Sequence, residues 1–328
     1  MSQSILVTYE PAAEEREIYR KTLGNLAQVY YLQDESDNNR NRLLTDADII
    51  VALSFSPTEI HSDKIALLQN TRFIQLIYAG ADKVPFAHIP GGVTVASNAG
   101  AFAGPIAEHV LGITLALAKN LVIKNRQLVE GRFDRTGFNR EINGSICGIV
   151  GFGGNGREIA GKMQAMGMQV YGINRSGRTD APIDFIGTVA DLRKVLEASD
   201  VFVLAAPLTR ATRNMIGKNE LNWMKQDAIL INVGRGDLID QKALYEHLIS
   251  HPQFQAGIDT WWSEPAESGP IKLEFPFFDL PNIVGSPHCA DHVPGSMQHA
   301  TRMALENVKK FLMGHEIRGR LIRQDYLA

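Results

Sequence analysis

The sequence predicts an α/β protein with two doubly wound parallel sheets. Short apolar runs alternate with helical segments through the first hundred residues, and the alternation restarts at Gly144 with the spacing of βα units. At 328 residues, the chain is long enough for about two domains. The pattern changes near Asn98 and near His292, so we place the domain boundaries there.

The predicted strands are short apolar runs bounded by polar or helical segments. In the first domain they cover 5–9, 27–32, 49–53, 73–77 and 93–97. In the second domain they cover 146–151, 169–173, 201–205, 228–233, 255–259 and 283–286. Near-continuous apolar strands of this kind are typical of a parallel sheet with helices on both faces.

Helical segments are predicted between these strands. The clearest cover 14–23, 155–166, 191–198, 218–224 and 241–250, and a last helix at 295–313 could return to the first domain. The stretch 105–130 is predicted as the longest helix, because it has no internal proline and ends at Gly131. Its apolar residues are too numerous for one solvated face, which favours a domain or subunit interface.

Composition excludes several classes of protein. The 36 acidic and 33 basic residues give a net charge of −3, without the basic excess of a nucleic-acid-binding domain. Cys147 and Cys289 are the only cysteines, which excludes a disulfide scaffold and favours a reducing compartment. No cluster of cysteine and histidine residues has the spacing of a zinc site. No signal peptide and no membrane-length apolar run is found. We expect a cytoplasmic protein without a metal, nucleic acid or membrane partner.

A glycine-rich loop follows the strand predicted at 146–151. Gly151, Gly153 and Gly156 form the G-x-G-x-x-G pattern between a strand and a helix. In a Rossmann domain these glycines permit a tight turn, a close approach of backbone to pyrophosphate, and close helix packing. The helix N-terminus, which contains Asn155, would offer N–H groups to the anion. The context predicts a dinucleotide site, and the alternative is a tight structural turn.

The strand predicted at 169–173 ends without the carboxylate that usually binds the ribose hydroxyls of NAD. Asn174 occupies that position and is followed by Arg175, Ser176 and Arg178. Two guanidinium groups and a hydroxyl could bind a 2′-phosphate through charge-assisted hydrogen bonds. We therefore expect a preference for NADP(H), with NAD(H) as a possible second coenzyme. The alternative is an ordinary solvated loop.

Three polar residues, Arg235, Glu264 and His288, follow three successive predicted strands. The carboxyl ends of parallel strands share one edge of the sheet, where ligands bind. His288 could protonate the alkoxide that forms when a hydride reduces a 2-oxo acid, and Glu264 would favour its imidazolium. Arg235 has the planar fork that matches a carboxylate. The alternatives are a structural histidine, a turn-capping arginine and a loop glutamate.

Taken together, the motifs resemble the D-isomer-specific 2-hydroxyacid dehydrogenases over nearly the whole chain. The matching segments are NGSICGIVGFGGNG, APLT, INVGRG, D-x-x-x-x-EP and SPH. The resemblance implies the same roles for the arginine, glutamate and histidine, and it implies that Asp259 contacts the nicotinamide carboxamide. Further cofactor contacts are expected from residues in APLT and INVGRG, namely Ala206, Pro207 and Val233.

The resemblance also implies a discontinuous architecture. A Rossmann cofactor domain, 99–291, would be inserted into a flavodoxin-like substrate domain formed by 1–98 and 292–328. Members of the family are usually dimers joined largely through the cofactor domain, and the apolar stretch 105–130 fits that use. We therefore expect a homodimer.

The same family holds the substrate carboxylate with backbone N–H groups of a glycine-containing loop. The matching loop here is Tyr78-Ala79-Gly80-Ala81, where small residues let the backbone approach an anion. The alternative is a simple turn after a strand. Phe55, Tyr78 and Phe102 could line a pocket for an apolar side chain, although core packing explains Phe55 and Phe102 equally well. Phosphoglycerate enzymes of the resembling family tend to carry an arginine in the loop after the third strand. The matching residues 53–56 here lack a positive charge, which disfavours a phosphorylated substrate.

The predicted function is reduction of a small 2-oxo acid to the D-2-hydroxy acid by NAD(P)H, as in glyoxylate or hydroxypyruvate reductases. One alternative is a formate-dehydrogenase-like enzyme, which Glu264 disfavours because that group has an amide there. Another is a nucleotide-sensing, non-catalytic scaffold of the same fold. The pair Trp261-Trp262 is interpreted as either a lid or an interface element.

Overall fold

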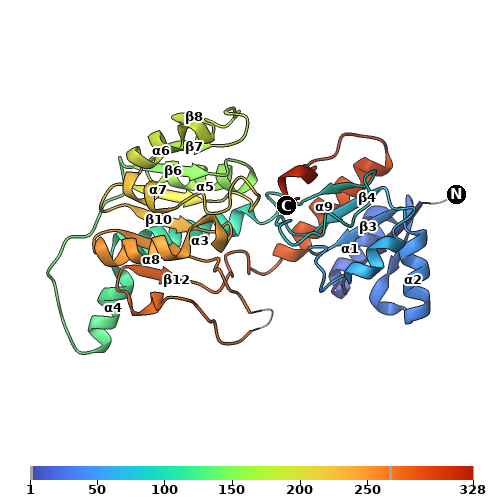
Figure 1. Ribbon diagram of the computed structural model, residues 1–328, viewed down its shortest axis with the longest axis horizontal. Coiled ribbons are helices and arrows are strands. Elements are labelled where there is room, and N and C mark those ends of the chain that lie inside the picture. The colour runs from blue at the N-terminus through green and yellow to red at the C-terminus, as the bar shows by residue number, and fades with distance from the viewer. Residues whose placement is uncertain (1–2, 266–267, 328) are drawn as a thin grey trace. The chain divides into compact units, whose positions relative to one another are not determined.

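The computed structural model describes residues 3–265 and 268–327. The chain divides into two compact units, the first formed by 1–102 and 293–328 and the second by 103–292. Each unit is built on one parallel sheet with helices packed against it, which confirms the predicted fold class (Figure 1).

Unit 1 has a five-stranded sheet of order β2-β1-β3-β4-β5, the flavodoxin-like order. The strands are β1 (Gln3–Val7), β2 (Ala27–Tyr31), β3 (Ile49–Ala52), β4 (Phe73–Leu76) and β5 (Thr94–Ala96). The helices are α1 (Ala13–Leu23), α2 (Asp37–Asp46) and α9 (Ser296–Leu312). Helix α9 packs on α1, where Thr301 Oγ1 donates a hydrogen bond of 2.9 Å to Glu15 Oε1.

Unit 2 has a seven-stranded sheet of order β12-β11-β10-β9-β6-β7-β8. The strands are β6 (Ile146–Val150), β7 (Gln169–Ile173), β8 (Phe185–Gly187), β9 (Val201–Leu204), β10 (Ile229–Asn232), β11 (Gln255–Ile258) and β12 (Ile283–Gly285). Strand order reverses between β6 and β9, as in a Rossmann fold, and ligands bind at such a reversal.

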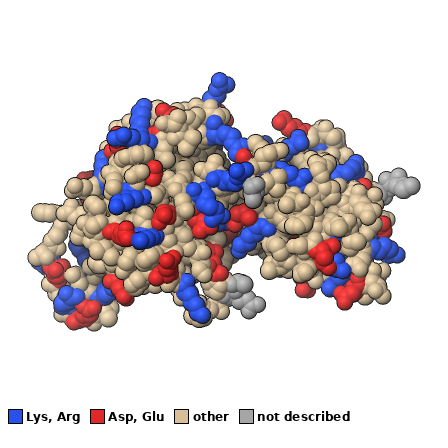
Figure 2. All heavy atoms as spheres, viewed as in Figure 1, with Lys and Arg blue, Asp and Glu red and all other residues tan. Residues whose placement is uncertain are grey.

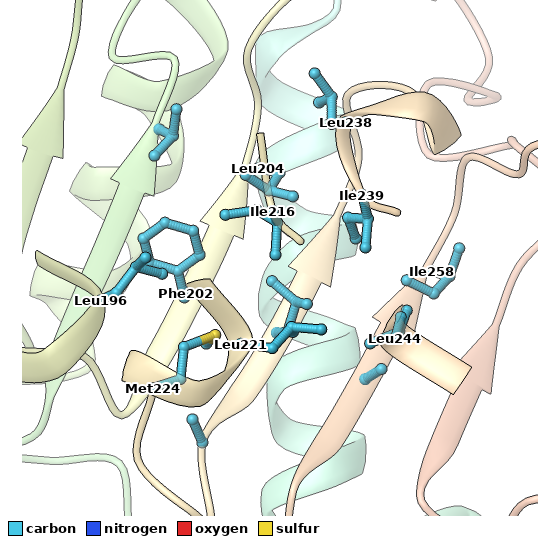
Figure 3. Packing of buried hydrophobic residues seen from close by; sticks show 14 of the residues in the cluster. Leu196, Phe202, Leu204, Ile216, Leu221, Met224, Leu238, Ile239, Leu244 and Ile258 are labelled. Carbon is cyan, nitrogen blue, oxygen red and sulfur yellow. The ribbon is translucent and has the colours of Figure 1, made fainter. Parts of the chain in front are cut away.

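The helices of unit 2 are α3 (Ala103–Ala118), α4 (Leu121–Val129), α5 (Gly154–Ala165), α6 (Leu192–Ala198), α7 (Lys218–Trp223) and α8 (Gln241–Ser250). One apolar cluster joins the sheet to α6, α7 and α8, and it includes Leu196, Phe202, Leu221 and Leu244 (Figure 3). A second cluster joins the sheet to α3 and α5. The two clusters cover the two faces of the unit 2 sheet. Because both faces are buried, the central strands of that sheet are apolar throughout.

Short 3-10 helices complete the described structure. They are η1 (Leu32–Asp34), η2 (Ser62–Leu67), η3 (Val189–Asp191), η4 (Gly236–Leu238), η5 (Phe277–Asp279) and η6 (Arg323–Asp325). Lys, Arg, Asp and Glu side chains of both signs are interspersed over the face of the molecule seen in Figure 2.

The prediction of one continuous helix over 105–130 was wrong. Helix α3 ends at Ala118 and α4 begins at Leu121, with a bend of 60° between them. Asn120 has a φ of +53°, a left-handed conformation that interrupts a right-handed helix and that asparagine tolerates better than most residues. No single helix among the described residues is long and apolar enough to cross a membrane. The bent pair α3–α4 is long and apolar enough only when its two helices are counted together.

Candidate active site

The glycine loop between β6 and α5 is shaped by close backbone contacts. Gly151 has a φ of +93°, and a Cβ at this position would lie 2.4 Å from Ala206 N. A Cβ on Gly156 would lie 2.5 Å from Gly151 O. The fold itself therefore requires these two glycines. In contrast, a Cβ on Gly153 would meet no atom within 4 Å, so protein packing does not explain that glycine.

This loop fits a dinucleotide. Asn155 lies in the first turn of α5, and its Oδ1 is buried and has no hydrogen-bond partner. A helix N-terminus at a strand-order reversal is also where a Rossmann domain binds pyrophosphate. The open position at Gly153 suits a ligand that approaches the backbone closely. Asn155 Oδ1 is an acceptor, so it would bind a hydrogen-bond donor of that ligand and not its phosphate oxygens.

Three other predicted cofactor residues lie at the ends of neighbouring strands. Ala206 is buried directly after β9, where its main-chain N abuts Gly151, and the adjacent Pro207 is exposed. Val233 follows β10 and belongs to the apolar cluster shared with α3 and α5. All three are on the edge of the sheet that carries the glycine loop.

The predicted phosphate loop after β7 is organised by Asn174. Its Oδ1 accepts hydrogen bonds from Ser176 N at 3.1 Å and from Gly177 N at 2.8 Å, and its Nδ2 donates to Arg178 O at 2.8 Å. Asn174 therefore shapes the turn. Arg175, Ser176 and Arg178 are exposed on it.

His288 and Glu264, which follow β12 and β11, form a hydrogen-bonded pair. His288 Nδ1 lies 2.8 Å from Glu264 Oε2, while Trp261 N donates to Glu264 Oε1 at 2.8 Å. Because Glu264 binds Nδ1, Nε2 is the ring nitrogen that can act on a substrate. The hydrogen bond to Glu264 raises the pKa of His288 against the opposing effect of burial. Burial raises the pKa of Glu264, but the hydrogen bonds from His288 and Trp261 outweigh it and the pKa is lowered.

Arg235 follows β10 and acts electrostatically on this pair. Its Nη1 donates a hydrogen bond of 2.7 Å to Gly234 O. Beside the larger effects of hydrogen bonding and burial, its positive charge lowers the pKa of both Glu264 and His288. The structure therefore brings together the three residues that the sequence places after separate strands.

Asp259, at the end of β11, holds the loop that carries His288. Its side chain is 1% exposed, and its Oδ1 accepts hydrogen bonds from Ser286 Oγ at 2.6 Å and Cys289 N at 3.1 Å. Its main-chain carbonyl accepts from His288 N at 2.8 Å. Burial raises the pKa of Asp259, but hydrogen bonds from His109 and Ser286 outweigh that effect and lower it.

His109 and Ser286 were missed by the sequence prediction. His109 Nε2, on α3, lies 2.8 Å from Ser286 Oγ and 3.5 Å from Asp259 Oδ1. The only signal in the sequence is a histidine within a mostly apolar helix. Such a residue is usually paired inside a fold, but the sequence does not identify its partner.

The predicted substrate loop lies after β4 in unit 1. The rings of Tyr78 and Phe102 are 5.6 Å apart, and both residues belong to this unit. Ala79 and Gly80 are partly exposed, whereas Ala81 is buried. Phe55 is 0% exposed within the unit 1 core, which favours core packing over a pocket wall.

The loop after β3 holds a carboxylate of its own chain. Glu59 accepts hydrogen bonds from the main-chain N–H groups of Leu53, Ser54 and Phe55 at 2.8, 3.0 and 2.9 Å. These donors are therefore satisfied internally. Within residues 3–265 and 268–327, no group of three or more His, Cys, Asp or Glu side chains could hold a metal ion.

This site is arranged as in a dinucleotide-dependent oxidoreductase. It combines a sheet of Rossmann order, a glycine loop, and an imidazole–carboxylate pair beside a guanidinium. Residues 111–290 match the family model of the D-isomer specific 2-hydroxyacid dehydrogenase, NAD binding domain. The chain belongs to the D-isomer-specific 2-hydroxyacid dehydrogenase family. It is a nicotinamide-dependent oxidoreductase of small 2-oxo or 2-hydroxy acids.

Similar proteins support this assignment. A glycerate dehydrogenase of Methylorubrum extorquens is 32% identical over 263 residues, covering 78% of this chain and 80% of its own. A hydroxypyruvate reductase of Thermotoga maritima is 28% identical over 272 residues, which cover 82% of this chain and 85% of the relative. The crystal structure of a putative formate dehydrogenase from Pyrobaculum aerophilum is similar, with a TM-score of 0.83 and 26% sequence identity. The match covers 99% of this chain and 100% of that one.

Proposed function

We propose that the protein reduces a small 2-oxo acid to the D-2-hydroxy acid with His288 as the proton donor. The observation that carries this proposal is the 2.8 Å contact between His288 Nδ1 and Glu264 Oε2, beside the charge of Arg235. A histidine whose pKa is raised keeps its proton at neutral pH, as a general acid for carbonyl reduction must.

The chain's own residues divide the work of this reaction. The nicotinamide, when bound, supplies the hydride. His288 Nε2 gives a proton to the carbonyl oxygen as it becomes an alkoxide, and Glu264 stabilises the imidazolium beforehand. Arg235 binds the substrate carboxylate and polarises the carbonyl. For the Tyr78–Ala81 loop of unit 1, the proposed role is to bind a carboxylate through main-chain N–H groups.

Hydroxypyruvate and glyoxylate are the first substrates to test. One relative is named for hydroxypyruvate reduction and another for the oxidation of glycerate, the alcohol that hydroxypyruvate reduction produces. A phosphorylated substrate is disfavoured, because Glu59 already occupies the N–H groups after β3. A carboxylate there would repel a phosphate.

NADP(H) is the proposed coenzyme. The loop after β7 has no carboxylate at the ribose position and exposes Arg175 and Arg178 on a turn held by Asn174. A charge-assisted hydrogen bond to a 2′-phosphate contributes about 1.5–3 kcal/mol, which corresponds to roughly 10- to 100-fold in preference.

A homodimer formed through an exposed apolar arm is also proposed. The arm is α4 with the loop 130–141, and no residue of α4 is buried. Figure 1 shows α4 and this loop extending away from the helices packed on the unit 2 sheet. Val129 and Phe138 are 80% and 99% exposed, and the arm's other exposed apolar residues are Leu121, Val122, Leu128 and Phe133. Large apolar side chains exposed together on one segment are typical of a protein interface.

The experiment is a spectrophotometric assay with NADPH and NADH against glyoxylate, hydroxypyruvate, phenylpyruvate and a phosphorylated 2-oxo acid. We expect turnover of a small unphosphorylated acid, with a higher kcat/KM for NADPH. Formate-dependent reduction of NAD(P)⁺ without turnover of any 2-oxo acid would instead support the formate enzyme. Tight nucleotide binding without any turnover would support the non-catalytic scaffold.

A further inference from the structure

Trp261 contacts all three loops that carry the proposed catalytic side chains. Its main-chain N–H donates to Glu264 Oε1, and its indole N–H donates to Ser286 O, each at 2.8 Å. A Cβ on Gly236 would lie 2.4 Å from Trp261 C, so the loop of Arg235 packs directly on the Trp261 backbone. The indole is 6% exposed, which excludes the lid that the sequence suggested.

The indole also packs closely on the loop that carries His288. A Cβ on Gly285 would lie 2.6 Å from the Cζ2 atom of Trp261, so this glycine leaves room for the ring. Ser286, whose carbonyl accepts the indole N–H, precedes His288 by two residues. Ser286 Oγ in turn donates to Asp259.

His288 needs this support because its backbone is strained. Its φ is +50°, in the left-handed region that non-glycine residues rarely occupy. Such a conformation persists only where surrounding contacts over-determine it. Trp261 provides one such contact on the His288 loop and another on Glu264.

We propose that Trp261 is a positioning residue, which fixes the geometry of the Glu264–His288 pair by donating its main-chain N–H to Glu264 and its indole N–H to Ser286 O. This inference rests on the proposed function, in which His288 is the proton donor. Trp261 touches no reacting atom. It acts by holding the carboxylate and the imidazole loop in one arrangement.

The test is Trp261→Phe, which keeps an aromatic ring and the main-chain N–H but removes the indole donor. We expect kcat for 2-oxo acid reduction to fall about 10- to 100-fold, the effect of a roughly 1 Å misplacement of a catalytic group. The KM for NADPH should not change. The pH at which activity falls should move to lower pH, because Glu264 stabilises the imidazolium less when the His288 loop is displaced from it.

Trp262→Phe is the matched control. Trp262 also donates one indole hydrogen bond to a main-chain carbonyl, that of Ile239 at 2.7 Å, and it stacks on Phe277. Its hydrogen bond does not reach the His288 loop. This variant should keep the wild-type pH profile, even if it loses a similar amount of thermal stability.

Two further measurements keep the test decisive. If Trp261→Phe does not fold, 3-benzothienylalanine at position 261 keeps the fused rings and replaces only the N–H by sulfur. An NMR titration of the His288 imidazole, identified by its absence in His288→Gln, reports its pKa without any turnover. The charged groups that act on it are Glu264, Arg235 and Asp259, and these variants leave all three in place.

We expect the His288 titration midpoint to fall in Trp261→Phe and to stay at the wild-type value in Trp262→Phe. An unchanged midpoint and pH profile in Trp261→Phe would overturn the positioning role, and so would the same result in the benzothienyl protein if Trp261→Phe does not fold. Failure of wild-type protein to reduce any 2-oxo acid would overturn the proposed function instead, and the titration would still decide the role of Trp261.

Discussion

His288 is held by more contacts than an ordinary loop residue. Its main-chain N donates to Asp259 O, its ring contacts Glu264, and its φ of +50° is one that few non-glycine residues adopt. Strained backbone of this kind is concentrated at functional sites. Because the hydrogen bond to Glu264 raises the pKa of His288, the effect of pH on the reaction can be predicted for substitutions of this pair.

Replacing Glu264 with Gln should shift the pH profile of reduction. In the wild type the hydrogen bond to Glu264 raises the pKa of His288, so the protonated donor persists above the ordinary value of about 6.5 and activity is lost as pH rises through the raised value. Without the carboxylate, burial and the charge of Arg235 both lower that pKa. The descending limb of kcat/KM against pH should therefore move to lower pH.

The control for this variant is Glu246→Gln. Glu246 is an exposed residue of α8 whose nearest cationic partner is Lys242, at 3.8 Å. It should leave the profile unchanged. If Glu264→Gln also left the profile unchanged, the imidazole–carboxylate pair would not control the proton donor.

At the scale of elements, the turn from β6 into α5 separates two roles of glycine. Gly151 is required by the fold, because its φ is +93° and Ala206 N leaves no room for a Cβ. Gly153 has open space around its Cβ position, so packing against the protein does not require a glycine there. The two glycines of the same loop should therefore respond differently to alanine.

We expect Gly151→Ala to destabilise the protein and Gly153→Ala to weaken coenzyme binding without unfolding it. The first substitution adds backbone strain and a clash, while the second places a methyl group where the pyrophosphate would approach. Thermal unfolding and calorimetric titration with NADPH measure the two effects. A Gly153→Ala protein that binds NADPH as tightly as the wild type would show that the pyrophosphate does not lie against this residue.

Much of this element-level description was predictable from sequence, for identifiable reasons. Buried parallel strands are apolar throughout, so β6 and β10 were found within a residue or two of their observed ends. The break at Asn120 was missed because no proline or glycine marks it. Strand β8 was also missed.

The site was predictable to the extent that its residues follow strands. Arg235, Glu264 and His288 each lie after a strand of the same sheet, and topology alone places them on one edge. The contacts of Trp261 and His109 were not predictable. Each depends on Ser286, which is 25 residues from one and 177 from the other. No local pattern encodes a hydrogen bond across that separation.

At the scale of the whole molecule, the apolar arm of α4 and 130–141 is the proposed dimer interface. Its exposed side chains include Leu128 and Val129, and the helix buries none of its own residues. A second copy of the chain is the proposed partner. An exposed helix of 9 residues is otherwise marginal, since isolated short helices are weakly stable in water.

Introducing charge on the arm should separate the proposed dimer. We expect the double substitution Leu128→Glu and Val129→Glu to give monomers by sedimentation velocity, because burying two carboxylates in an apolar interface costs more than the contact provides. Val189→Glu is the control, since this residue is also an exposed apolar one but lies in η3. A wild-type protein that sediments as a monomer would contradict the dimer.

The most direct test of the account is the rate of hydroxypyruvate reduction by NADPH in His288→Gln. Glutamine keeps a polar side chain of similar length but cannot act as a general acid near neutral pH. We predict that kcat falls at least about 100-fold, the lower end of what general acid catalysis contributes, while the dissociation constant of NADPH is unchanged. Turnover at the wild-type rate would show that another group supplies the proton.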